Sequence, residues 1–266
     1  WQSRAALPRS RVMTADYSLL PSRNVADQIA STLRSEIAAG TWGVGQMLPA
    51  EHQLMERFGV SRPSCREALR ILQSEGLLEI QRGNRGGARV VPPDPSRIAL
   101  FAGVFLQMRN STITEVFETR MTIEPAAVRS FTRHGTREIL SQLAQNAASQ
   151  RFIVHDRPSF YQRGRDFREL LVRNCGSESL RLLCLVIGEI ADMQLSVLSR
   201  ALPHDPDQES RFLTAIRIKE EMIAHIEAGD GEAAAQSWHG YLRYYLDRLH
   251  EITPPETRTM KPFPLD

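Results

Sequence analysis

Apolar residues recur at helical spacing along most of this chain, and strand-like alternation is confined to one short stretch. Val25, Ile29, Leu33 and Ile37 fall on one stripe, which predicts an amphipathic helix over residues 24–39. Beyond residue 96 the same spacing predicts helices over 136–150, 158–174, 178–201, 208–228 and 231–252. Glycines and prolines between these segments mark stops and turns. The pattern therefore predicts a mainly α protein.

Residues 47–70 predict two short helices joined by a tight turn. Gly59 stands where the first helix must end, because glycine accepts the left-handed backbone that closes a helix. Ser61 is a favourable N-cap for the next helix, and Pro63 is tolerated because it falls in the first turn. The segment has the layout of a helix-turn-helix.

The second of these helices has two distinct faces. With Arg62 at zero on a helical wheel, Arg66 and Arg70 lie within about 80° of it. A separate arc holds apolar side chains that can pack, namely Cys65, Ala68, Leu69 and Leu72. A packing face beside a cationic face is typical of a recognition helix that enters DNA.

A predicted β-hairpin follows the helix pair. Two short β-runs surround Gly83-Asn84-Arg85-Gly86-Gly87, which suits a hairpin tip. Three helices and a basic β-wing make a winged helix-turn-helix, which we place at residues 21–92. Residues 1–20 lack periodicity and are expected to form a flexible extension.

Several motifs of this region occur in a fixed order, namely Gly45–Glu51, Val60–Arg62, Arg66–Arg70 and Glu75–Leu78. Together they resemble the N-terminal domain of GntR-type bacterial transcription regulators. In that family the arginines at the positions of Arg62 and Arg66 read guanines, and the wing approaches the minor groove. The resemblance implies the DNA-binding residues Ser61, Arg62, Ser64, Arg66, Arg82, Arg85, Gly86 and His52.

The formal net charge of +2 is unevenly distributed. Residues 1–92 carry 12 Lys and Arg against 8 Asp and Glu, or +4, and residues 93–266 carry 21 against 23, or −2. This weak cationic bias suits a module that faces phosphates. Three cysteines without metal spacing are expected to be reduced and buried. No apolar run reaches the length of a membrane span, so we expect a cytoplasmic protein.

The prolines of Pro92-Pro93-Asp94-Pro95 predict a stiff linker, assigned to residues 93–96. A bundle of six or seven antiparallel helices follows over residues 97–252, with a tail at 253–266. The core of such a bundle is a natural place for a small ligand.

This second region also carries a resemblance. Glu115–Arg120, Glu124–Ala127, Phe167 ahead of Cys175–Leu180, and Ala228–Asp230 are similar to the effector domain in the FadR branch of the family. Most such domains hold a metal with an Asp and three His. The register places those four positions at Gly164, Arg168, Lys219 and Tyr241.

Two cations, a phenol and a glycine are unsuited to a divalent ion, so we expect no metal and no other cofactor. Arg168 and Lys219 instead suggest a site for an anion, with Tyr241 and Arg120 assisting. Because charges left empty in a bundle core are costly, an anion should occupy that site. The alternative is that these cations pair with core acids such as Glu169 or Glu220, or reach solvent.

These observations predict a DNA-binding transcription regulator, a repressor, that binds an inverted-repeat operator as a homodimer. A small carboxylate or other anionic effector would control its affinity for DNA by changing how two winged domains are placed across the linker. Two alternatives stay open: a degenerate, ligand-free dimerisation domain, and a response to acyl-CoA. No Ser-His-Asp, Cys-His or paired-carboxylate constellation can be placed in the helical region, so we do not expect an enzyme.

Overall fold

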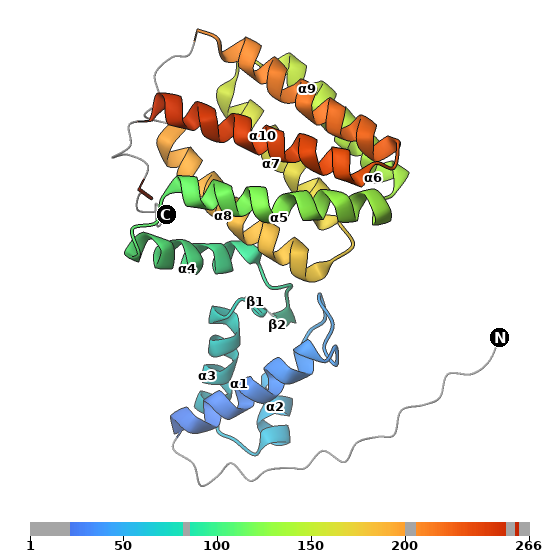
Figure 1. Ribbon diagram of the computed structural model, residues 1–266. Coiled ribbons are helices and arrows are strands. Elements are labelled where there is room, and N and C mark those ends of the chain that lie inside the picture. Colours follow the sequence, from blue (N-terminus) through green and yellow to red (C-terminus); the bar gives the residue numbers. More distant parts are fainter. Residues whose placement is uncertain (1–21, 82–85, 200–205, 254–258, 261–266) are drawn as a thin grey trace, which may run out of the picture. The chain divides into compact units, whose positions relative to one another are not determined.

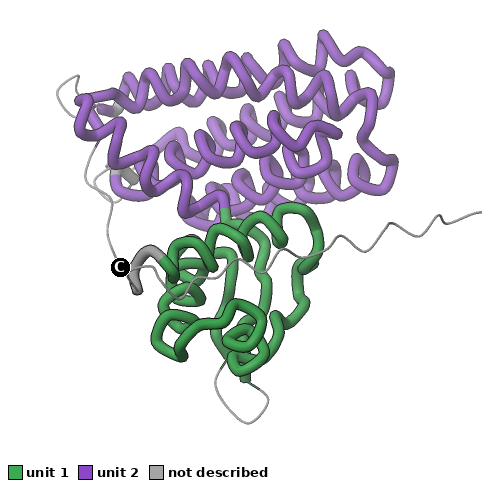
Figure 2. Tube along the Cα trace, turned by 90° about the horizontal axis from the view of Figure 1, so that it is seen from below, with its two compact units in different colours: residues 1–94 green, residues 95–266 purple. Residues whose placement is uncertain are grey.

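The computed structural model describes residues 22–81, 86–199, 206–253 and 259–260 (Figure 1). The chain divides into two compact units, residues 1–94 and 95–266 (Figure 2), and each has its own hydrophobic core. Within the described ranges there are ten α-helices, one short 3₁₀ helix and one two-stranded sheet. The predicted mainly α fold is confirmed. The predicted N-terminal extension, residues 1–20, lies outside the described residues.

Three helices build the core of the first unit: α1 (Ser22–Ala38), α2 (Glu51–Phe58) and α3 (Arg62–Ser74). The stripe predicted for α1 packs inward, with Val25 4% exposed and Ile29 and Leu33 fully buried. The apolar arc of α3 meets it through Cys65, Ala68 and Leu72. Periodicity alone therefore identified the buried faces correctly.

The turn between α2 and α3 follows the sequence signals with one difference. Gly59 closes α2 at a φ of 64°, in the left-handed region that glycine tolerates. Pro63 lies in the first turn of α3. Ser61 occupies the predicted N-cap position with an extended backbone, but its side chain makes no cap hydrogen bond. The Ser61 hydroxyl instead pairs with the Ser64 hydroxyl, 3.1 Å away.

The wing consists of β1 (Leu78–Gln81) and β2 (Gly87–Val90), which pair antiparallel from Leu78 opposite Val90 to Gln81 opposite Gly87. Its tip, residues 82–85, lies outside the described residues. An isolated bridge joins Met47 to Arg89, so the segment before α2 is tied to the wing. The strands of the wing share one hydrophobic core with the helix pair.

The second unit is a helical bundle (Figure 1). Its helices are α4 (Pro95–Met108), α5 (Ile113–His134), α6 (Arg137–Ser149), α7 (Arg157–Arg173), α8 (Glu178–Ser199), α9 (Gln208–Glu227) and α10 (Gly231–Ile252), with the 3₁₀ helix η1 (Gln150–Ile153). Helix α5 packs between α8 and α10, α9 packs on α10, and α4 lies on α8. The expected six or seven helices are present in the described part.

Two boundaries differ from the sequence-based expectation. Helix α4 begins at Pro95, so half of the expected linker is helical, because proline suits the first position of a helix. Part of the expected tail packs on the bundle: Met260 is 6% exposed, and its N–H donates to the Ser111 carbonyl at 3.1 Å. Among the described residues, no helix is both long and apolar enough to cross a membrane.

Candidate functional site

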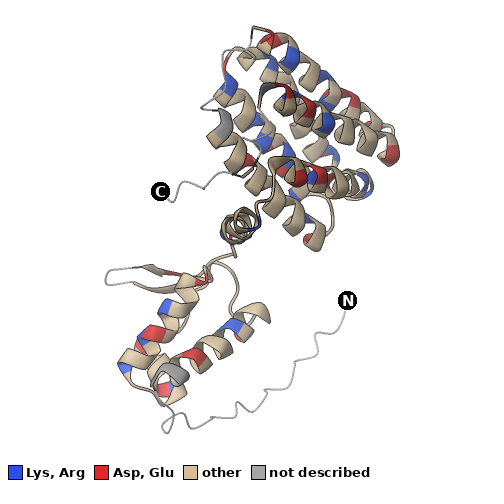
Figure 3. Ribbon diagram, turned by 60° about the vertical axis from the view of Figure 1, so that its left-hand side comes forward, with Lys and Arg blue, Asp and Glu red and all other residues tan. Residues whose placement is uncertain are grey.

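The exposed face of α3 carries the arginines that the helical wheel placed there. The side chains of Arg62, Arg66 and Arg70 are 67%, 61% and 77% exposed. Acidic and basic residues lie along the same helices of this unit (Figure 3), so the surface is not uniformly basic. Position on the recognition helix, rather than bulk charge, sets these arginines apart.

Glu51, the first residue of α2, holds two of these arginines. The Arg62 Nε donates to Glu51 Oε1 at 2.8 Å, and the Arg66 Nε lies 3.1 Å and 3.2 Å from the two carboxylate oxygens. Burial raises the pKa of the Glu51 carboxyl, but hydrogen bonds from Arg62 and Arg66 outweigh it and leave the pKa below its ordinary value. Both arginines are therefore paired with one internal carboxylate.

The other predicted DNA contacts fall into three groups. His52, Ser61 and Gly86 are exposed. Ser64 is less accessible than predicted, because it is 9% exposed and its hydroxyl faces Ser61. It follows Arg62 by two residues, or about 200° around the helix, which turns it away from the arginine face. Arg82 and Arg85 lie outside the described residues.

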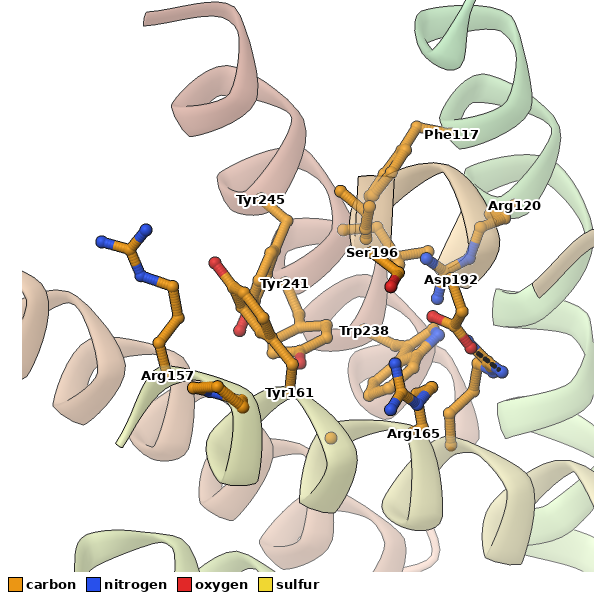
Figure 4. A pocket seen from close by; sticks show the side chains of 15 residues that line it. Phe117, Arg120, Arg157, Tyr161, Arg165, Asp192, Ser196, Trp238, Tyr241 and Tyr245 are labelled. Atoms are coloured by element: carbon orange, nitrogen blue, oxygen red, sulfur yellow. Dashed lines mark hydrogen bonds and ion pairs between the residues drawn. The ribbon is translucent and has the colours of Figure 1, made fainter. Parts of the chain in front are cut away.

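The second unit contains a cavity of about 320 Å³ between α5, α7, α8 and α10 (Figure 4). A cavity of this volume is at the lower end of the range for small-molecule sites. Its lining combines aromatic rings, arginines and a few small or polar residues: Phe117, Arg120, Arg157, Pro158, Tyr161, Gly164, Arg165, Arg168, Asp192, Leu195, Ser196, Trp238, Tyr241, Leu242 and Tyr245. Three of the four predicted effector-binding residues, Arg120, Arg168 and Tyr241, are among them.

Lys219, the fourth predicted residue, lies behind the pocket wall. A Cβ placed on Gly164 would be 3.7 Å from the Tyr241 hydroxyl and 3.9 Å from the Lys219 Nζ. The structure therefore brings Gly164, Lys219 and Tyr241 to one place, although they come from three helices.

Two of the predicted cations already have internal counter-ions. The Arg120 Nε is 2.6 Å from Glu124 Oε1, and the Trp238 Nε1 donates to the other oxygen of Glu124 at 2.8 Å. The Arg168 Nη2 is 2.7 Å from Asp192 Oδ2. Arg168 therefore follows the alternative of pairing with a core acid, and an anion is not required to neutralise it.

The compensating acids also differ from those anticipated. Glu169 binds Arg173 on the surface of α7, and Glu220 binds Arg151. Each points away from the pocket because its position on the helix faces solvent, with side chains 35% and 39% exposed. The acids that reach the core lie on α5 and α8.

Arg168 is enclosed closely. A Cβ added at Gly188 would lie 2.7 Å from the Arg168 Cζ, so only glycine leaves room for this guanidinium. Burial lowers the pKa of Arg168, but the charge and hydrogen bond of Asp192 outweigh that effect and raise it. The Arg168 Nε is buried and has no hydrogen-bond partner within the described residues.

Lys219 has a different environment. It is fully buried, and its Nζ donates to Gln150 Oε1 at 2.6 Å. The Nζ also lies 4.9–5.4 Å from the ring centres of Phe160, Phe167 and Tyr241. Burial lowers the pKa of Lys219 to about 7.

The residues present do not fit the metal that the family resemblance implies. Gly164 offers no donor, and Arg168 donates rather than ligates. Of the nearby histidines, His239 is exposed and His225 is half-buried, and neither lines the pocket. Within the described ranges, no three His, Cys, Asp or Glu side chains form a group that could hold a metal ion.

Two pocket arginines escaped the sequence analysis. Arg157 donates to Gln208 Oε1 at 2.9 Å, and Arg165 hydrogen-bonds the side chain of Gln162. The only available signal for Arg165 was its place beside Gly164, one of the four register positions. For Arg157 the sequence offered none, because its approach to the pocket depends on how α7 lies in the bundle.

Comparisons with known proteins agree with this arrangement. Residues 25–90 match the model of bacterial regulatory proteins, gntR family, and residues 115–244 match that of the FCD domain. The chain is 28% identical over 218 residues to the HTH-type transcriptional repressor NanR of Enterobacter sp. (strain 638), covering 73% of this chain and 83% of that protein.

Further matches extend over more of the chain. The galactonate operon transcriptional repressor of Escherichia coli (strain K12) is 26% identical over 234 residues, covering 86% of this chain and 99% of that one. The solved structure of Streptococcus agalactiae GntR shares the fold, with a TM-score of 0.64, 20% identity, and coverage of 84% and 99%. With a winged helix-turn-helix in one unit and a helical FCD domain in the other, this chain belongs to the gntR family of bacterial regulatory proteins and is a DNA-binding transcription regulator.

Proposed function

We propose that this protein represses transcription by binding an inverted-repeat operator as a homodimer, and that a small acidic metabolite in the α5–α10 pocket controls its affinity for DNA. The observation that supports ligand binding is the arginine-lined cavity of about 320 Å³ in the bundle. A domain used only for dimerisation has no need of such a cavity. Its small volume also favours a small acid over an acyl-CoA.

The choice of an acid follows from the charges at the cavity. Four arginines line it, and among the described lining residues Asp192 is the one carboxylate. The cationic side chains therefore exceed the acidic ones, which favours an anionic ligand. Tyrosine hydroxyls from α7 and α10 add donors for further polar groups. One relative is named for the operon of a sugar acid, so sugar acids belong in a first ligand panel.

Helix α4 offers a surface for the proposed homodimer. Phe101, Phe105 and Met108 are 76%, 62% and 78% exposed, and their spacing of four and three places them on one helix face. Three large apolar side chains exposed on one face are typical of a protein–protein contact. A second copy of the chain is the partner that an inverted-repeat operator requires.

We assign the pocket no cofactor and the chain no catalytic step, in line with relatives that are transcription regulators. A DNA-bound role places the protein in the bacterial cytoplasm. Coupling between effector and DNA would be on the order of 1–3 kcal/mol. An effector that binds tightly but leaves operator affinity unchanged would contradict the regulatory half.

The DNA half is tested by fluorescence anisotropy on a duplex selected from a random library by the wild-type protein. Arg62→Ala and Arg66→Ala should each lose about 1–3 kcal/mol of binding and relax preference at one base pair. Arg217→Ala, at a 69% exposed side chain of α9, is the matched control and should bind like wild type. Equal binding by all three variants would contradict the assignment.

A further inference from the structure

Lys219 is unusual among the cations of this chain. It is one of two lysines, beside Lys261. The described hydrogen bond of its Nζ goes to a neutral group, the side-chain amide of Gln150. The Nε2 of Gln150 donates to the side chain of Asn146 at 2.7 Å, which leaves its Oε1 directed toward the lysine. Within the described ranges no carboxylate pairs with Lys219, whereas Arg120 and Arg168 each have one.

The amine is separated from the pocket by very little. Gly164 lines the cavity and has no side chain, and the position of its missing Cβ is within 4 Å of both the Lys219 Nζ and the Tyr241 hydroxyl. A ligand atom lying against Gly164 would therefore meet an amine and a phenol together. Any larger residue at this position would put a side chain between the pocket and the amine.

The surroundings keep a useful fraction of this amine uncharged. Three aromatic rings and the core of the bundle exclude water from the Nζ, and this burial lowers the pKa of Lys219 to about 7. An ordinary lysine, with a pKa near 10.4, is almost entirely protonated at neutral pH. A desolvated lysine with a free electron pair is a nucleophile for carbonyl carbon.

A group that can bind a carboxylate lies next to Gly164 in the chain. Arg165 follows Gly164 on α7 and lines the same cavity. Its described hydrogen bond is to the neutral side chain of Gln162, and the Glu189 carboxyl interacts with it through charge, without a described hydrogen bond or ion pair. The pocket thus places a guanidinium for an acid group one residue along α7 from the glycine that lies against the amine.

We propose that Lys219 captures a carbonyl-bearing acid of the 2-oxo acid class as a Schiff base, with Arg165 binding the carboxylate of the same molecule. This inference rests on the proposed ligand-binding function and names its ligand class. The uncharged Nζ adds to the carbonyl carbon, and the C–O π electrons take up a proton to give a carbinolamine. Loss of that hydroxyl as water leaves a C=N bond, and both amine protons end on the water released.

Tyr241 is positioned to move the protons of this exchange. Burial raises the pKa of its hydroxyl, so the phenol stays protonated and can donate to the departing hydroxyl. A hydrogen bond joins it to Tyr245, which also lines the cavity. No oxidant, reductant or metal is needed, because imine formation only exchanges a C=O bond for a C=N bond.

The test is reductive trapping on the full-length protein. Wild type is incubated with glyoxylate, pyruvate or 2-oxoglutarate, treated with sodium cyanoborohydride, and mapped by peptide mass spectrometry. We expect a stable adduct on Lys219 with at least one of these acids and little on Lys261. No adduct on Lys219 with any of the three, or equal labelling of both lysines, would overturn the inference. Mapping wild type does not depend on the folding of a variant.

Matched hydroxy acids separate this inference from the proposed function. Glycolate, lactate and 2-hydroxyglutarate have the same carboxylates but no 2-oxo group. The trapped 2-oxo acid should bind at least about tenfold more tightly than its hydroxy partner, and Lys219→Arg should remove that difference. If the two acids bind equally and no adduct is trapped, the Schiff base is refuted, but the proposed binding of a carboxylate in the pocket is not. If no carboxylate binds at all, the proposed function fails as well.

Discussion

The ion pair between Arg168 and Asp192 offers a direct test of how this bundle tolerates its buried charges. Their closest atoms are 2.7 Å apart, and the two side chains are only 4% and 10% exposed. Asp192→Asn keeps the size of the side chain but removes its charge, which leaves the guanidinium of Arg168 buried without a counter-ion. Removing one partner of a buried pair costs about 3–5 kcal/mol.

This energy should be visible as a large shift in melting temperature. The helical unit extends from residue 95 to residue 266, a size at which 1 kcal/mol corresponds to about 2–4 °C. Asp192→Asn should therefore lower the melting temperature by about 6–20 °C. The remaining hydrogen bond of the asparagine places the result toward the lower end of this range.

The assay is thermal unfolding followed by circular dichroism, in a buffer without phosphate, sulfate or carboxylates. The double variant Arg168→Met with Asp192→Leu should recover most of the loss, because no charge is left to desolvate. Glu169→Gln is the matched control on α7, since its partner Arg173 is 53% exposed and such pairs contribute about 0–1 kcal/mol. If Asp192→Asn melts as Glu169→Gln does, Asp192 is not the counter-ion of Arg168.

Three further outcomes are expected. Gly188→Ala should lower the melting temperature, because the new Cβ would lie 2.7 Å from the Arg168 Cζ, whereas Gly240→Ala on α10, with open space around it, should stabilise by about 0.5–1 kcal/mol. In urea titrations, wild type should gain stability relative to Lys219→Met from pH 7 to 9, and a constant difference would contradict this. The reason is that the pKa of Lys219 is about 7 in the folded protein against 10.5 in the unfolded chain, so the unfolded chain binds more protons over this range. Phe101→Glu should shift the protein from dimer to monomer in analytical ultracentrifugation, and an unchanged dimer would remove α4 from the proposed interface.

Much of the fold could be predicted from the sequence, because its signals act between near neighbours. The apolar stripe of α1 repeats within a few residues, and Gly59 ends α2 through its own backbone. The same locality placed Arg62 and Arg66 on the open face of α3. Family motifs added the register that put Gly164, Lys219 and Tyr241 at one site, which periodicity alone does not provide.

The partners of these residues were decided only by the tertiary structure. Periodicity indicates which side of a helix is buried, but not which side chain of another helix faces it. Asp192 is 24 residues from Arg168, and Gln150 is 69 residues from Lys219, so no local rule links them. Packing of α8 against α7 supplied a carboxylate to the arginine, and η1 gave the lysine only an amide. That difference, set by contacts between distant segments, separates a neutralised cation from a reactive amine.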